Sequence, residues 1–109
     1  MTALTTDLNR IAILNRGEPA VRFCRALADY NAERGTDIHS VALYTDPDAD
    51  SPFTRLAHHA MCLGPAMVQG PDGAMISPYL DIERVVKALR QSGCDAVWPG
   101  WGFAAEDAV

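Results

Sequence analysis

The sequence predicts an α/β domain, with a three-layer, Rossmann-like parallel sheet covered by helices on both faces. Short apolar runs alternate with amphipathic segments along the 109 residues, in the order strand–helix–strand–short helix–strand–helix–strand. Such alternation is typical of parallel sheets packed between helices. Right-handed crossovers leave few topologies for this order. We expect the spatial strand order 3-2-1-4.

The first half of the chain supplies two predicted strands and a long helix. Arg10–Asn15 contains the continuous apolar run of a strand buried on both faces. Gly17-Glu18-Pro19 then opens a helix, because proline is tolerated in a first helical turn. This helix is predicted to run to about Glu33 and to end at Gly35. Ile38–Tyr44 is the second predicted strand, and a polar turn follows it.

The second half repeats the alternation with shorter elements. Glycine and proline between residues 64 and 77 predict a long loop. Asp81 is a predicted N-cap, because the apolar residues after it recur at helical spacing. The expected elements are a short helix from Ser51-Pro52 to about His58, a strand at Ala60–Leu63, a helix from Asp81 to Gly93 and a strand at Ala96–Trp98.

Length and composition predict one domain, residues 10–109, after a polar tail at residues 1–9. The net charge of -5 argues against a nucleic-acid surface, which needs clustered lysine and arginine. No apolar run approaches the roughly 20 residues of a membrane helix. The three cysteines lack C-x-x-C spacing, which gives no support for a zinc site or a disulfide framework. We expect a cytoplasmic protein.

Two loops are predicted to meet where the strand order reverses. Ligands of open α/β sheets bind beyond the carboxyl ends of the strands at such a switch point. Strands 1 and 4 are neighbours in the predicted order, and they lead into Asn15-Arg16-Gly17-Glu18 and Gly100-Trp101-Gly102-Phe103. Flanking glycines let a ligand approach the backbone, and Trp101 offers a stacking face.

The first loop does not match a known phosphate-binding motif. It lacks the glycines of a dinucleotide fingerprint and the Gly-Lys-Ser/Thr of a P-loop. Glu18 would also repel a pyrophosphate at the start of the helix. On the residues alone, the favoured interpretation is a tight turn in which Arg16 and Glu18 form local salt bridges.

Two further features have a structural and a functional interpretation. Arg22, Arg25 and Asp29 share a helix face, which is either solvated or an interface stripe, since arginine is enriched at interfaces. His58-His59 invites a metal interpretation, but adjacent helical residues point about 100° apart. Asp46, Asp48 and Asp50 lack the glycine and glutamate of a calcium loop. We therefore expect no metal site.

Taken together, several stretches resemble the amino-terminal, pre-ATP-grasp domain of biotin carboxylase from biotin-dependent acyl-CoA and pyruvate carboxylases. They occur in the family's order and cover most of residues 10–107. The matching stretches are ILNRGEPAVRFCRAL, YTDPDADSPFTRLA, CLGPA, YLDIERVV and DAVWPGWGFAAED. Departures include Trp101 where most bacterial members have tyrosine, and His58-His59 in place of an acidic pair.

The resemblance implies a ligase that uses MgATP and bicarbonate to carboxylate biotin held on a carrier. It implies a downstream ATP-grasp domain, which supplies the ATP, metal and catalytic residues, so none of these is expected here and the chain alone should be inactive and bind no cofactor. A biotin carrier domain and a carboxyltransferase are the implied partners. Val109 ends inside an apparent helix, so we expect a fragment cut before the ATP-grasp domain.

Three groups of residues carry over from the family. Gly100, Trp101 and Gly102 match a turn that faces the biotin site. Arg22, Arg25 and Asp29 match a helix face at the homodimer interface of bacterial members. Asn15, Arg16, Gly17 and Glu18 match the signature first loop. Two alternatives stay open: a free-standing flavodoxin-like ligand-binding or signalling module, and the pre-ATP-grasp domain of another ligase such as carbamoyl-phosphate synthetase.

Overall fold

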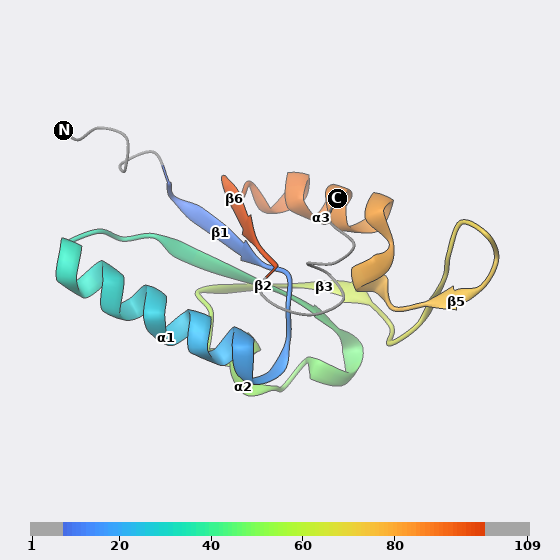
Figure 1. The fold of residues 1–109 in the computed structure, drawn as a ribbon, viewed down its shortest axis with the longest axis horizontal. Coiled ribbons are helices and arrows are strands. Elements are labelled where there is room, and N and C mark those ends of the chain that lie inside the picture. Colours follow the sequence, from blue (N-terminus) through green and yellow to red (C-terminus); the bar gives the residue numbers. More distant parts are fainter. Residues whose placement is uncertain (1–7, 100–109) are drawn as a thin grey trace.

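A four-stranded parallel sheet forms the centre of the protein. The computed structural model describes residues 8–99, and the strand order is β3-β2-β1-β6. Because β6 is the fourth strand of this sheet, the predicted order 3-2-1-4 is confirmed. Figure 1 shows the sheet between α1 and α3. The strands are β1 (Arg10–Ile13), β2 (His39–Thr45), β3 (His59–Gly64) and β6 (Ala96–Trp98).

One face of the sheet is covered by α1 (Gly17–Arg34) and α2 (Pro52–Leu56). Phe53 of α2 is fully buried and packs in a cluster with Ile13 and Ala42 of the sheet. The buried residues of α1 are Ala20, Val21, Cys24 and Leu27. The helix ends as predicted, at Gly35 in the left-handed conformation.

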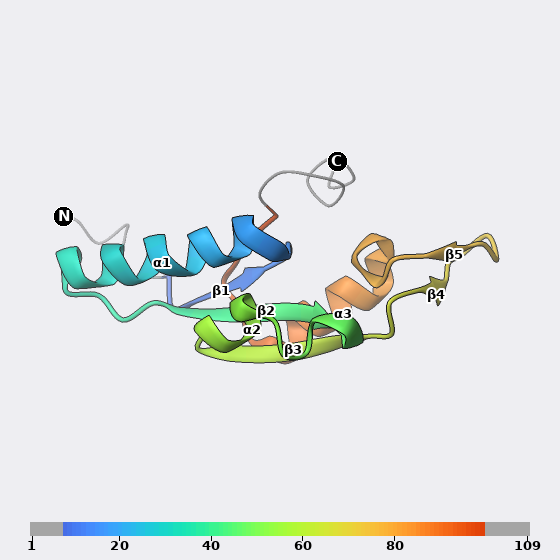
Figure 2. The same cartoon turned by 90° about the horizontal axis from the view of Figure 1, so that it is seen from below.

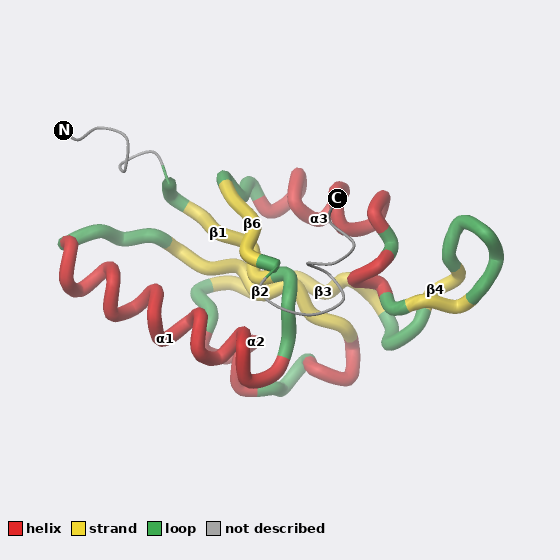
Figure 3. Tube along the Cα trace, in the orientation of Figure 1, coloured by secondary structure: helices red, strands yellow, loops and turns green. Residues whose placement is uncertain are grey.

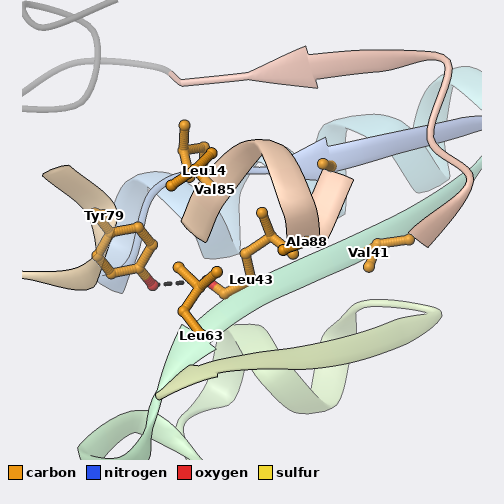
Figure 4. Close-up of a cluster of buried hydrophobic side chains, with 8 residues drawn as sticks. Leu14, Val41, Leu43, Leu63, Tyr79, Val85 and Ala88 are labelled. Atoms are coloured by element: carbon orange, nitrogen blue, oxygen red, sulfur yellow. Dashed lines mark hydrogen bonds between the residues drawn. The ribbon is translucent and has the colours of Figure 1, made fainter. Parts of the chain in front are cut away.

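The other face is covered by α3 (Ile82–Ser92), which completes the predicted three layers. Asp81 is its N-cap, as predicted, and its side chain accepts a hydrogen bond from the Arg84 backbone N–H. Figure 4 shows the cluster under this helix, where the Tyr79 hydroxyl donates to the Leu43 carbonyl oxygen at 2.6 Å. The buried cluster comprises Ala12, Leu14, Val41, Leu43, Leu63, Tyr79, Val85 and Ala88.

The predicted loop at residues 64–77 is wrong in part, because the structure forms a hairpin there. β4 (Val68–Gln69) pairs antiparallel with β5 (Met75–Ile76). The turn between them closes because Gly73 adopts a φ of 90°, which side chains other than hydrogen disfavour. Figure 2 shows this hairpin extending away from the sheet.

The remaining boundaries differ from the prediction by a few residues. β1 ends at Ile13, so Leu14 and Asn15 belong to the loop before α1, drawn in green in Figure 3. Two short 3-10 turns, Asp46–Asp48 and Pro78–Leu80, precede α2 and α3. Within residues 8–99, no helix combines the length and apolar character that crossing a bilayer requires.

Candidate functional site

The first loop and the end of β6 lie side by side at the carboxyl edge of the sheet. The Leu14 backbone N–H donates to the Trp98 carbonyl oxygen at 3.0 Å, which extends the pairing of β1 with β6. The buried Asn15 side chain then donates from Nδ2 to the Pro99 carbonyl oxygen at 2.9 Å. Its Oδ1 accepts from the Arg16 backbone N–H at 2.8 Å. Asn15 therefore ties the first loop to the residue that precedes Gly100.

Arg16 pairs with Asp48, so the predicted local salt bridge between Arg16 and Glu18 is wrong. Arg16 Nε and Nη2 lie 2.6 and 2.8 Å from the two carboxylate oxygens of Asp48, a bidentate contact. Asp48 follows the end of β2, which neighbours β1 in the sheet. The topology thus brings a partner 32 residues away to the guanidinium, and the bidentate geometry suits the planar fork of arginine.

This ion pair sets the electrostatics of the edge. The hydrogen bond from Arg16 lowers the pKa of Asp48, and the same contact raises the pKa of Arg16. Burial raises the pKa of Tyr79, with the nearby Asp48 charge adding to the effect. Near neutral pH the Asp48 carboxylate is therefore ionised and the Tyr79 hydroxyl is protonated. A hollow of about 230 Å³ here is lined by Arg16, Thr45, Pro47, Asp48, Ala66, Ser77 and Tyr79.

The ion pair predicts an acid-sensitive contribution to stability. Because the pKa of Asp48 is lowered from its ordinary 3.8 in the folded chain, the contribution is complete above pH 3.8 and is lost as pH falls through the folded pKa. We expect Asp48→Asn to cost about 1 kcal/mol at neutral pH, a small value because Arg16 is half exposed. Urea unfolding at pH 7 and pH 3 measures it. An equal cost at both pH values would contradict this account.

The start of α1 combines a glycine turn with an acidic residue. Gly17 has a φ of 69°, so the chain enters the helix through a conformation that favours glycine. Glu18 lies in the first turn of α1, where its charge opposes an anion. Arg16, at the end of this loop, is already paired with Asp48, and the expectation that the chain binds no ATP stays a prediction.

The residues of the predicted interface stripe are exposed on α1. Arg22, Arg25 and Asp29 all lie on its solvent side, and whether they contact a second copy stays a prediction. The residues that directly follow them in sequence, Phe23, Ala26 and Tyr30, line an apolar hollow of about 490 Å³. Its other lining residues are Leu8, Ile11, Leu27 and Ile38.

The predicted biotin-side turn, Gly100, Trp101 and Gly102, lies outside the described residues. The structure reaches Pro99, whose carbonyl oxygen is held by Asn15. The predicted meeting of the two loops stays a prediction, because the structure describes only the contact of Asn15 with Pro99, the residue before the turn.

Sequence comparison identifies the family of this chain. The profile of the biotin carboxylase N-terminal domain family matches residues 7–109. The chain belongs to this family. The flavodoxin-like module and the carbamoyl-phosphate synthetase domain are therefore not favoured.

Three curated relatives show how this domain occurs in longer proteins. The biotin-dependent acyl-coenzyme A carboxylase alpha3 subunit of Mycobacterium leprae is 40% identical over 104 residues, which are 95% of this chain and 15% of that protein. Biotin carboxylase 1 of Bacillus subtilis is 36% identical over 93% of this chain and 20% of its own length. Biotin carboxylase of Haemophilus influenzae is 34% identical, again over 93% and 20%. The chain thus spans about a fifth or less of these relatives.

Asp48 and Tyr79 are site residues that the sequence patterns did not single out. In the sequence Asp48 belongs to an acidic turn, and its position after the second strand places it at the carboxyl edge beside the first loop. Tyr79 had no signal of its own, because its burial depends on the 3-10 turn at Pro78–Leu80. The position of Asp48 just after a strand was the one sequence feature that could have indicated its place in the site.

Proposed function

We propose that the chain is the amino-terminal part of a biotin carboxylase that uses MgATP and bicarbonate to carboxylate biotin on a carrier. The family membership supports this proposal, as do relatives named as biotin carboxylases. In this account the chain carries no catalytic group. Its role is to form and position one wall of the biotin site.

The observation that carries the proposal is the hydrogen bond between Asn15 and Pro99. It connects the family's signature loop to the chain immediately before Gly100, Trp101 and Gly102. A side chain that fixes the start of a turn limits the positions that the turn can adopt, and such positioning governs how a bound substrate meets its reactant. Asn15 is thus a positioning residue in this proposal.

MgATP and bicarbonate are assigned to the downstream part of the protein. Arg16 already forms an ion pair with Asp48, and the negative charge of Glu18 at the start of α1 repels phosphate. No reaction step is therefore placed on this chain. The three free cysteines, Cys24, Cys62 and Cys94, are consistent with a reducing compartment, and we propose the cytoplasm.

We further propose four partners: the downstream ATP-grasp domain, the biotin carrier domain, a carboxyltransferase and a second copy of the enzyme. The homodimer contact would involve Arg22, Arg25 and Asp29. The exposed stripe that they form adjoins the apolar hollow at Phe23, Ala26 and Tyr30. An arginine-rich rim beside an apolar patch has the composition of a protein interface.

Activity of two matched proteins tests the proposed function. The full-length gene product should release ADP in a reaction that needs both bicarbonate and biotin. Residues 1–109 alone should release none, because they lack the ATP-binding residues. Release of ADP by residues 1–109, or ADP release by the full-length protein that is indifferent to biotin, would contradict the proposal.

A further inference from the structure

All three histidines of the chain meet at the amino edge of the sheet. His39 begins β2 and His59 begins β3, and His58 precedes His59. The His39 and His58 rings stack with centroids 4.3 Å apart, and His39 Nδ1 lies 3.1 Å from His59 Nε2. The prediction that His58 lies on the short helix is wrong, since α2 ends at Leu56. His39, which joins the two adjacent histidines, comes from the neighbouring strand β2.

Asp37 adds a carboxylate to this cluster. Ligand atoms of Asp37, His39 and His58 all lie within 4.8 Å of one another. The distance from His39 Nε2 to Asp37 Oδ2 is 3.4 Å. Ligand atoms of a tetrahedral zinc site lie roughly 3.3–3.6 Å apart, because each bond is about 2.0–2.2 Å long. The Asp37–His39 pair is thus already at the required separation. The His39 and His58 rings are nearly parallel, at 5°, so one ring has to rotate out of the stack before both can direct a nitrogen at the same ion.

We propose that Asp37, His39 and His58 form a binding site for Zn²⁺ or a similar divalent transition metal. Two imidazoles and one carboxylate are a ligand set that zinc accepts, with water in the fourth position. The ligands come from the loop before β2, from β2 itself and from the segment before β3. A bound ion therefore cross-links the amino ends of two neighbouring strands.

Hydrogen bonds assign the ligand atoms. A metal on His39 Nε2 requires a proton on Nδ1, which then donates to His59 Nε2, and such a contact orients metal-ligating histidines. His59 therefore acts as a hydrogen-bond acceptor. In the structure, His58 Nδ1 accepts from the Ser40 backbone N–H at 3.0 Å, so the ring proton is on Nε2. A metal on Nε2 moves that proton to Nδ1, which then gives up the bond from the Ser40 N–H and can donate to Ser40 Oγ at 3.2 Å.

The proposed site is separate from the candidate functional site. β2 begins at His39 and ends at Thr45, so the two sites lie roughly 20 Å apart along that strand. The ion would bind the folded chain in preference to the unfolded one, and so raise its melting temperature. The inference does not depend on the proposed function.

Zinc titration of the untagged 109-residue chain tests the proposal, with calorimetry for stoichiometry and thermal unfolding for stabilisation. We expect one equivalent of Zn²⁺ per chain and a rise in melting temperature. His39→Gln, His58→Gln and Asp37→Asn should each weaken binding at least tenfold. His59→Gln should weaken it by about tenfold, the range found for residues that support metal ligands.

Two control variants separate this site from other zinc ligands. Glu83→Gln removes an exposed carboxylate on α3, and Cys62→Ser removes the exposed thiol of β3. Both should bind zinc as the wild type does. Circular dichroism of every variant checks its fold. The proposal is overturned if the wild type does not bind, if the three ligand variants bind unchanged, or if Cys62→Ser abolishes binding.

Discussion

Phe53→Ala is expected to destabilise the chain by about 3–5 kcal/mol, the usual cost of removing a buried phenylalanine side chain. Phe53 is fully buried and is the largest such side chain in the described residues. It is held between α1 and the sheet, in the cluster with Ile13, Ala20 and Ala42. Since small domains unfold with about 5–15 kcal/mol, this loss removes a large part of the total stability.

Leu56→Ala is the matched control, because Leu56 lies on the same short helix and is 47% exposed. We expect a cost below about 1 kcal/mol for this variant. Phe53→Leu provides a milder change if the alanine variant does not fold. Urea unfolding followed by circular dichroism measures all three. A Leu56→Ala variant that is less stable than Phe53→Ala would contradict the assigned core.

The layers and the strand order were predictable because they depend on local patterns. The apolar runs at Ile11–Leu14 and Val41–Leu43 and the glycines after α1 and α3 each act within a few residues. The right-handed crossover rule then converts the element order into a sheet order. The hairpin at residues 68–76 was not predicted, because two-residue strands give too short a pattern and its turn resembles any glycine-rich loop.

The place of the first loop in the sheet was predictable, but its contacts were not. A strand end and a topological rule placed the first loop beside the chain before Gly100. The bond from Asn15 to Pro99 and the pair of Arg16 with Asp48 join residues far apart in sequence, and single-sequence patterns do not contain such pairings. The same reason explains why His39 was not linked to His58: only the register of β2 with β3 brings them together.

In the proposed full-length biotin carboxylase, Asn15→Asp is expected to slow carboxylation of biotin about 100-fold, with little change in the KM for ATP. The substitution keeps the shape and the acceptor Oδ1 for the Arg16 N–H. It replaces the Nδ2 donor by an oxygen that repels the Pro99 carbonyl oxygen. Displacing a substrate-positioning turn by about 1 Å can cost a factor of this size.

Asn31→Asp is the matched control for this change. Asn31 makes the same kind of contact, from Nδ2 to the Ile38 carbonyl oxygen at 2.9 Å, but it lies at the far end of α1. Steady-state kinetics with biotin and ATP varied separately should show normal rates for this variant. An Asn31→Asp enzyme as slow as Asn15→Asp would indicate that the loss of activity comes from a general loss of fold and not from displacement of the turn.

A double-mutant cycle with Asn15→Asp and Trp101→Ala tests the central claim that Asn15 acts through the turn at Gly100–Gly102. Trp101→Ala alone should impair the use of biotin more than the binding of ATP. If Asn15 only positions that turn, Asn15→Asp should cost little further activity once Trp101 is removed. Rate losses that multiply in the double variant would show that the two residues act independently, and would contradict the claim.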